Sequence, residues 1–82
     1  MNRSKYQQKT LETGQKALAK RELEILKLIA AGFENRRIAQ TLDLSVQTVR
    51  NHTNRIYEKL GIPNEPGIYQ RVRAVLLFLE EC

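Results

Sequence analysis

The sequence predicts a small all-α protein: a four-helix bundle that contains a helix-turn-helix, preceded by a mobile basic N-terminal arm. Apolar residues recur at three- and four-residue steps from Leu18 onwards, glycines and prolines interrupt this pattern, and no stretch has the alternation of a strand. The 82 residues leave room for one domain with a modest core. The first residues are polar and nearly free of aliphatic side chains, so burial cannot offset the entropy lost on ordering them. We therefore expect an arm over residues 1–17 and a folded domain over residues 18–82.

The first helix is predicted from an apolar face that repeats with the helical period. This face comprises Leu23, Leu26, Ile29, Ala30 and Phe33. Gly32 is expected to end the helix, because glycine readily adopts the left-handed backbone that follows many helices. Ala19 has no side-chain acceptor for a backbone amide, so it cannot act as an N-cap. We therefore expect this helix to begin before Leu18, with Thr13 or Thr10 as its N-cap.

Two further helices are predicted on either side of a short break. Asn35 can cap a short helix from Arg36 to Leu42, and the break follows at Asp43. Ser45 is a good N-cap for a third helix, near Val46 to Leu60, because its hydroxyl can accept from amides that lack a helical partner. These features predict two helices joined by a tight turn.

The end of the chain is predicted to form a loop and a fourth helix. Gly61 is the expected end of the third helix, and a loop with two prolines follows over residues 62–70. The fourth helix is marked by Ile68, Val72, Val75, Leu76 and Leu79. We expect this helix to complete the bundle.

The second and third predicted helices have the residues that a helix-turn-helix requires. Such a unit needs a small residue where the helices touch and apolar residues in the wedge between them. Ala39 is the small residue, and the wedge is formed by Ile38, Leu42, Leu44 and Val49. Asp43 stands at the turn position often taken by glycine, and aspartate tolerates a left-handed backbone better than most residues.

The charge and the outer face of the third helix indicate double-stranded DNA as the partner. Lysine and arginine number 14 against 9 aspartate and glutamate, a net charge of +5 that favours a polyanion. The major groove is wide enough to admit one helix. In this groove, an Arg side chain can bind a guanine edge and an Asn side chain can bind an adenine edge. We predict base contacts by Arg50, Asn51 and Asn54. We predict phosphate contacts by Asn35, Arg36, Ser45, Thr48, His52, Arg55 and Lys59.

Four short motifs in this arrangement resemble one family. They are Leu18-Ala-Lys-Arg-Glu22, Ile38-Ala39, Thr48-Val49-Arg50-Asn51-His52 and Lys59-Leu60-Gly61. Together they resemble the LuxR-type (NarL/GerE-like) helix-turn-helix family, over about residues 18–79. The resemblance implies a DNA-binding effector domain of a transcriptional regulator, whose third helix reads DNA and whose last helix serves as a dimer contact. By position it implies base contacts at Arg50, Asn51 and Asn54 and backbone contacts at Thr48 and Arg55.

A homodimer on DNA is expected, because one module of this size reads only a few base pairs. The candidate dimer contact is Val72, Leu76, Leu77 and Phe78, with simple packing on the first helix as the alternative. The loop over residues 62–70 is several residues longer than is usual in the resembled family, which bears on how the fourth helix docks. RNA polymerase is a further candidate partner.

The sequence is also compatible with two other functional hypotheses. One is a promoter-recognition domain like that of a sigma factor, and the other is a helical protein-interaction module. An enzyme is disfavoured because no acid–base pair, nucleophile or metal cluster is apparent, and we expect no cofactor and no small-molecule substrate. No apolar run approaches the roughly 20 residues of a membrane span, so we expect a cytoplasmic protein with no membrane partner.

Overall fold

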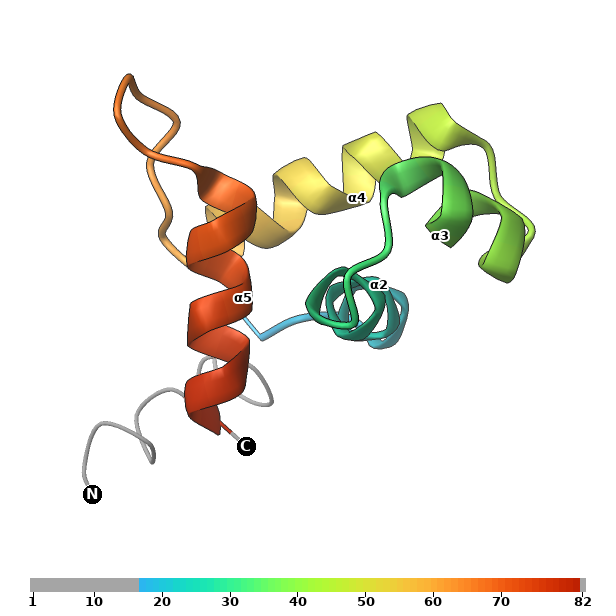
Figure 1. Cartoon of the computed structure of the whole chain (residues 1–82), viewed down its shortest axis with the longest axis horizontal. Helices are drawn as coiled ribbons and strands as arrows, with labels where there is room; N and C mark the ends of the chain where they lie inside the picture. Colours follow the sequence, from blue (N-terminus) through green and yellow to red (C-terminus); the bar gives the residue numbers. More distant parts are fainter. Residues whose placement is uncertain (1–16, 82) are drawn as a thin grey trace.

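The computed structural model describes residues 17–81, which contain four helices and no strand. The helices are α2 (Lys20–Ala30), α3 (Asn35–Leu42), α4 (Val46–Lys59) and α5 (Gln70–Glu81). α2 contacts each of the other three helices and lies below α4 and beside α5 in the view of Figure 1. This arrangement confirms the predicted all-α class and its helix-turn-helix. The predicted N-terminal arm, apart from Ala17, lies outside the described residues.

The core is built from the apolar face of every helix. Its fully buried apolar side chains are Ile25, Leu26, Ile38, Val49, Ile56 and Ala74. Burying one large aliphatic side chain contributes about 1.5–3 kcal/mol relative to leaving it exposed. Because α2 supplies two of these side chains and contacts all the other helices, its packing fixes the position of the helix-turn-helix.

The start of α2 corrects a prediction from the sequence. Ala19 is extended, with φ −69° and ψ 162°, and the helix begins at Lys20, so the expectation that it begins before Leu18 is wrong. Glu22 is the physical reason, because its Oε1 accepts a 2.8 Å hydrogen bond from the backbone N–H of Ala19. The first turn is thus closed without a capping side chain. Both predicted caps, Thr10 and Thr13, lie outside the described residues.

Glycines end α2 and α4 in the same way, as the sequence predicts. After α2, the N–H of Phe33 donates to the carbonyl of Leu28 at 3.0 Å, around Gly32 at φ 95°. After α4, the N–H of Ile62 donates to the carbonyl of Tyr57 at 2.9 Å, around Gly61 at φ 73°. Both ends are Schellman motifs, which reverse the chain and satisfy carbonyls that the helix leaves unpaired.

The turn between α3 and α4 has the predicted chemistry. Asp43 adopts φ 58° and ψ 50°, the left-handed conformation, and the N–H of Leu44 donates to the carbonyl of Ala39 at 2.8 Å. Ser45 is the N-cap of α4, and its Oγ accepts from the N–H of Thr48 at 3.0 Å. These local bonds set the angle between α3 and α4, and the small Ala39 is buried between them.

The longer loop before α5 does not prevent this helix from docking. Ile62 is buried, and Gln70 Nε2 donates to its carbonyl at 3.3 Å, so the two ends of the loop lie together. The residues between them form a loop that projects beyond the N-terminal end of α5 (Figure 1). Ala74 is fully buried and α5 packs against α2. The extra residues therefore extend outwards and leave the bundle intact.

Candidate nucleic-acid interface

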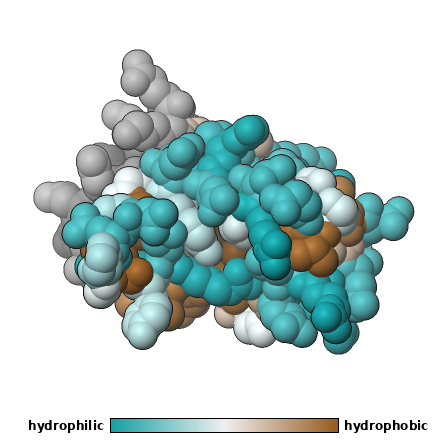
Figure 2. Space-filling view, turned by 90° about the horizontal axis from the view of Figure 1, so that it is seen from above, coloured by the Kyte–Doolittle hydropathy of each residue, from teal (hydrophilic) through white to brown (hydrophobic). Residues whose placement is uncertain are grey.

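The two faces of α4 differ sharply in polarity. Its inner face is buried and comprises Val49, Thr53, Ile56 and Tyr57. The three residues predicted to contact bases, Arg50, Asn51 and Asn54, are all exposed. Seen from the side of α4 that faces away from α2, the surface is mainly hydrophilic, with apolar side chains in small separate patches (Figure 2). The helix therefore presents a polar ridge that the rest of the domain leaves uncovered.

Several predicted phosphate contacts flank this ridge. Arg36 on α3 and Arg55 on α4 are exposed, whereas His52 is half-buried. At the start of α4, Ser45 and Thr48 bind each other: besides its capping bond, Ser45 Oγ donates to Thr48 Oγ1 at 2.8 Å. These five residues thus lie on α3, on α4 or at the N-cap of α4, all within the helix-turn-helix.

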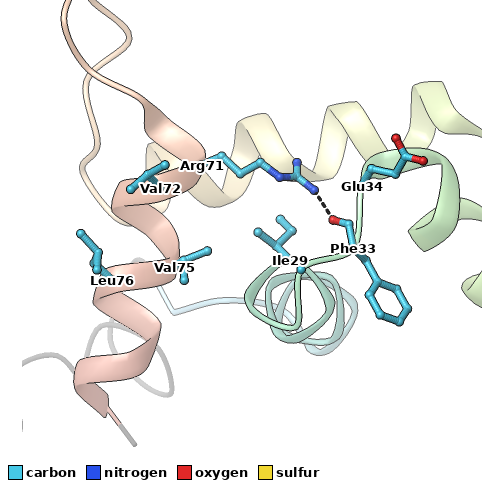
Figure 3. A pocket seen from close by; sticks show the side chains of 8 residues that line it. Ile29, Phe33, Glu34, Arg71, Val72, Val75 and Leu76 are labelled. Atoms are coloured by element: carbon cyan, nitrogen blue, oxygen red, sulfur yellow. Dashed lines mark hydrogen bonds between the residues drawn. The ribbon is translucent and has the colours of Figure 1, made fainter.

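Asn35 occupies a different position from the one predicted. It is the first residue of α3, and Glu34 precedes it as the N-cap without a side-chain hydrogen bond, so the predicted cap is wrong. Its Oδ1 instead accepts a 2.9 Å bond from Arg71 Nη1 of α5, and Arg71 Nη2 donates to the carbonyl of Phe33 at 2.6 Å (Figure 3). Asn35 therefore joins α3 to α5 through its side-chain oxygen, and its amide nitrogen remains able to donate to a phosphate.

Lys59 forms an ion pair inside the domain that was not predicted. Its Nζ donates to Glu22 Oε1 at 2.8 Å, and the Glu22 side chain is only 2% exposed while that of Lys59 is 28% exposed. Burial raises the pKa of the Glu22 carboxyl, but hydrogen bonds from Lys59 and Ala19 and the positive charges of Lys59 and Arg55 outweigh it. The pKa of Glu22 is therefore below its ordinary value of 4.5. This bond uses one of the three N–H donors of Lys59, so the phosphate contact of Lys59 stays a prediction.

The predicted dimer contact on α5 divides into two pairs of residues. Val72 and Leu76 are 55% and 54% exposed, whereas Leu77 and Phe78 are partly buried and pack against the core. Two residues outside the prediction, Tyr69 and Leu79, are also highly exposed. They flank Val72 and Leu76 at helical spacing, so α5 and the residue before it carry one continuous apolar stripe.

A shallow groove of about 390 Å³ lies between this stripe and the end of α2 (Figure 3). It is lined by Ile29, Gly32, Phe33, Glu34, Arg71, Val72, Val75 and Leu76. Its walls are mostly apolar, and the hydrogen bonds of Arg71 close one side. The role of Arg71 could not be predicted, because a single arginine at the start of an apolar helix gives no sign of its partners.

Other kinds of site are not apparent in the part of the chain that the structure describes. Within residues 17–81, no group of three or more His, Cys, Asp or Glu side chains could hold a metal ion. Over the same residues, no helix has the length and apolar character needed to cross a membrane.

Two helices joined through a left-handed turn, the second capped by Ser45 and exposed along a polar face, define a helix-turn-helix DNA-binding domain. Comparison with known proteins supports this assignment to the helix-turn-helix class. The family model described as bacterial regulatory proteins, luxR family, matches residues 16–72, which is most of the chain. The chain belongs to this luxR family of bacterial regulators and contains its DNA-binding transcriptional regulator domain.

Curated relatives of the chain include the oxygen regulatory protein NreC of three Staphylococcus aureus strains, JH9, JH1 and USA300. Each is 49% identical over 55 residues, which are 67% of this chain and 25% of the relative. The chain thus matches about a quarter of the length of these relatives. No solved structure matches the chain.

Proposed function

We propose that the chain is a sequence-specific reader of double-stranded DNA that places the first half of α4 in the major groove. The observation that carries this proposal is the exposure of Arg50, Asn51 and Asn54 opposite the buried face of α4. A helix held on one side by a core and uncovered on the other has the shape and width that the major groove accepts. The net charge of +5 supports attraction to phosphate.

Each exposed side chain has a role that its chemistry supports. Arg50 can donate two hydrogen bonds to the O6 and N7 of guanine, and Asn51 and Asn54 can pair with the N6 and N7 of adenine. The phosphate contacts in this proposal are Arg36, Ser45, Thr48, His52, Arg55 and Lys59, with the amide nitrogen of Asn35. They hold the register of the helix and carry no sequence information of their own.

This proposal is tested by comparing a preferred duplex, selected from a random library, with a scrambled duplex of equal composition. Replacing Arg50, Asn51 or Asn54 by Ala should reduce the preference for the selected duplex by about 1–3 kcal/mol each. Arg21→Ala is the charge-matched control for Arg50→Ala, because Arg21 lies on α2 in an exposed pair with Glu24. Equal weakening on both duplexes would show that α4 makes only phosphate contacts.

We also propose that the protein binds DNA as a homodimer through α5. The stripe of Tyr69, Val72, Leu76 and Leu79 supports this, because its members are spaced by three, four and three residues and each is more than half exposed. This spacing is that of a helix–helix seam. Two-fold pairing would set the recognition helices about 34 Å apart, in successive major grooves.

A role in transcriptional regulation implies a protein partner in addition to DNA. A regulator bound near a promoter acts by recruiting RNA polymerase or by blocking its access, so we propose RNA polymerase as the further protein partner. We place the protein in the cytoplasm, where bacterial DNA and polymerase are found. The family supports a role in binding rather than catalysis, and we propose no enzymatic activity.

A further inference from the structure

Two exposed amide side chains on α4 bind each other. Gln47 Nε2 donates to Asn51 Oδ1 at 3.1 Å. The two residues are four apart, so they lie one above the other on the same face of the helix, and both are exposed. The predicted base contacts include Asn51 but not Gln47.

This hydrogen bond restricts the orientation of the Asn51 amide. An amide oxygen has two acceptor positions, of which Gln47 uses one, so the second remains available together with both N–H groups of Asn51. Adenine offers one donor, N6–H, and one acceptor, N7, side by side in the major groove. Asparagine binds N6 and N7 together only when its amide group lies in the plane of the base with its oxygen and nitrogen toward that edge. A neighbour that holds the plane reduces the rotational freedom lost on binding.

The surrounding side chains leave the pair undisturbed. Ser45 and Thr48, in the same first turns of α4, bind each other and so do not compete for either amide. Thr53 Oγ1 donates to the carbonyl of Arg50 and points into the core. Gln47 is therefore the side chain whose hydrogen bond reaches Asn51 among those of the described residues.

We propose that Gln47 is a positioning residue for adenine recognition by Asn51. It holds the Asn51 amide in the orientation that pairs with adenine N6 and N7, and it thereby contributes to the sequence preference of the protein. This inference rests on the base-contacting role proposed above for Asn51. Gln47 is needed for discrimination between bases, and affinity for a scrambled duplex does not depend on it.

The experiment uses the full 82-residue chain and the duplex selected from a random library. Gln47→Met keeps the length of the side chain but removes its amide. Gln40→Met is the matched control, because Gln40 is also exposed but lies on α3. Each adenine of the duplex is replaced in turn by purine, which lacks the N6 amino group. The adenine read by Asn51 is the one whose replacement no longer matters in Asn51→Ala.

We expect Asn51→Ala to reduce the preference for that adenine by about tenfold. Gln47→Met should reduce it by about two- to fivefold, from the lost pair and the extra rotation of Asn51. The Gln47→Met, Asn51→Ala double variant should be no worse than Asn51→Ala alone, since Gln47 acts through Asn51. Gln40→Met should leave the preference unchanged, and all variants should bind the scrambled duplex equally.

A second readout reports the positioning itself. In the free protein, NMR relaxation of the Asn51 side-chain nitrogen should show greater motion in Gln47→Met than in the parent or in Gln40→Met. The inference is overturned if Gln47→Met keeps the full preference, if the losses in the double variant add, or if the motion of Asn51 is unchanged. If instead Arg50→Ala, Asn51→Ala and Asn54→Ala each weaken binding to selected and scrambled duplexes alike, the proposed function itself is overturned.

Discussion

The carboxylate of Glu22 and the ammonium group of Lys59 lie 2.8 Å apart and join the first turn of α2 to the last turn of α4. The same Oε1 of Glu22 also accepts from the backbone N–H of Ala19. One buried oxygen thus closes the start of the central helix and fixes the far end of the helix proposed to read DNA. We expect this contact to matter for stability more than an exposed ion pair does.

Lys59→Met tests this contact. The substitution leaves the Glu22 carboxylate buried without its ammonium partner, and we expect the free energy of unfolding to fall by about 1–3 kcal/mol. Urea denaturation measures this free energy. The dependence of the free energy on urea concentration should be unchanged if the variant unfolds in the same transition as the parent. Glu24→Gln is the matched control, because it breaks the exposed Arg21–Glu24 pair and should cost less than about 0.5 kcal/mol. A loss in Lys59→Met no larger than that in Glu24→Gln would contradict the expectation.

The Glu22 carboxyl should also make stability depend on pH. Its pKa in the folded protein is below its ordinary value of 4.5, so its ionised form stabilises the fold. This contribution is fully present above the unfolded pKa and is lost as the pH falls through the lowered folded pKa. We therefore expect unfolding free energy to fall on acidification below about pH 4.5, and to fall less steeply in Glu22→Gln. Parallel pH profiles for the two proteins would rule out this source of acid sensitivity.

Ala19→Ser should stabilise the protein. Ala19 is exposed and already has the extended backbone of an N-cap, and Glu22 supplies the reverse half of a capping box. A serine hydroxyl would accept from the N–H of Glu22 and complete the box, for a gain of about 1 kcal/mol. Thermal unfolding measures the gain. Ala31→Ser, at the exposed C-cap of α2, is the control and should give none; an equal rise in both variants would mean that capping is not the cause.

The features predicted correctly from the sequence are those set by local chemistry. Ser45 as a cap, Asp43 in a left-handed turn and glycines after α2 and α4 each depend on neighbours within a few residues. The α3–α4 wedge was predictable for the same reason, because a short turn between two helices leaves few ways to pack them. These features were enough to predict the class of domain.

The features that the sequence did not predict depend on distant partners. Lys59 and Glu22 are 37 residues apart, and Arg71 and Asn35 are 36 apart, so no local pattern relates them. Lys59 and Asn35 were predicted to have other roles, and Arg71 none. Helical periodicity says which residues share a face, but it does not say which charged side chain bends back to meet another helix.

The rotation of α5 about its own axis could not be predicted from the sequence either. Residues 75–78 are four consecutive apolar residues, so the periodicity does not choose between their faces. Docking against α2 makes the choice: Leu77 and Phe78 pack against the core, and Leu76 remains exposed. This rotation determines which residues can form a dimer contact.

The contrast between Leu76 and Leu77 tests the proposed dimer. Leu76→Glu places a charge on the exposed stripe, so the isolated domain should keep its unfolding free energy to within about 0.5 kcal/mol. Its affinity for a duplex with one half-site should also be unchanged. On a duplex with two half-sites, we expect it to lose the extra affinity that pairing provides, because a carboxylate would be buried between the two copies of α5.

Leu77→Glu should behave differently, because Leu77 packs against the core and a charge there costs about 2–4 kcal/mol of stability. Its binding to one-site and two-site duplexes should decline together, in step with the fraction of unfolded protein. Leu79→Glu, which changes another exposed member of the stripe, should repeat the behaviour of Leu76→Glu. Sedimentation with each duplex measures how many copies bind. If Leu76→Glu and Leu79→Glu bind the two-site duplex as tightly as the parent, the stripe on α5 is not the dimer contact.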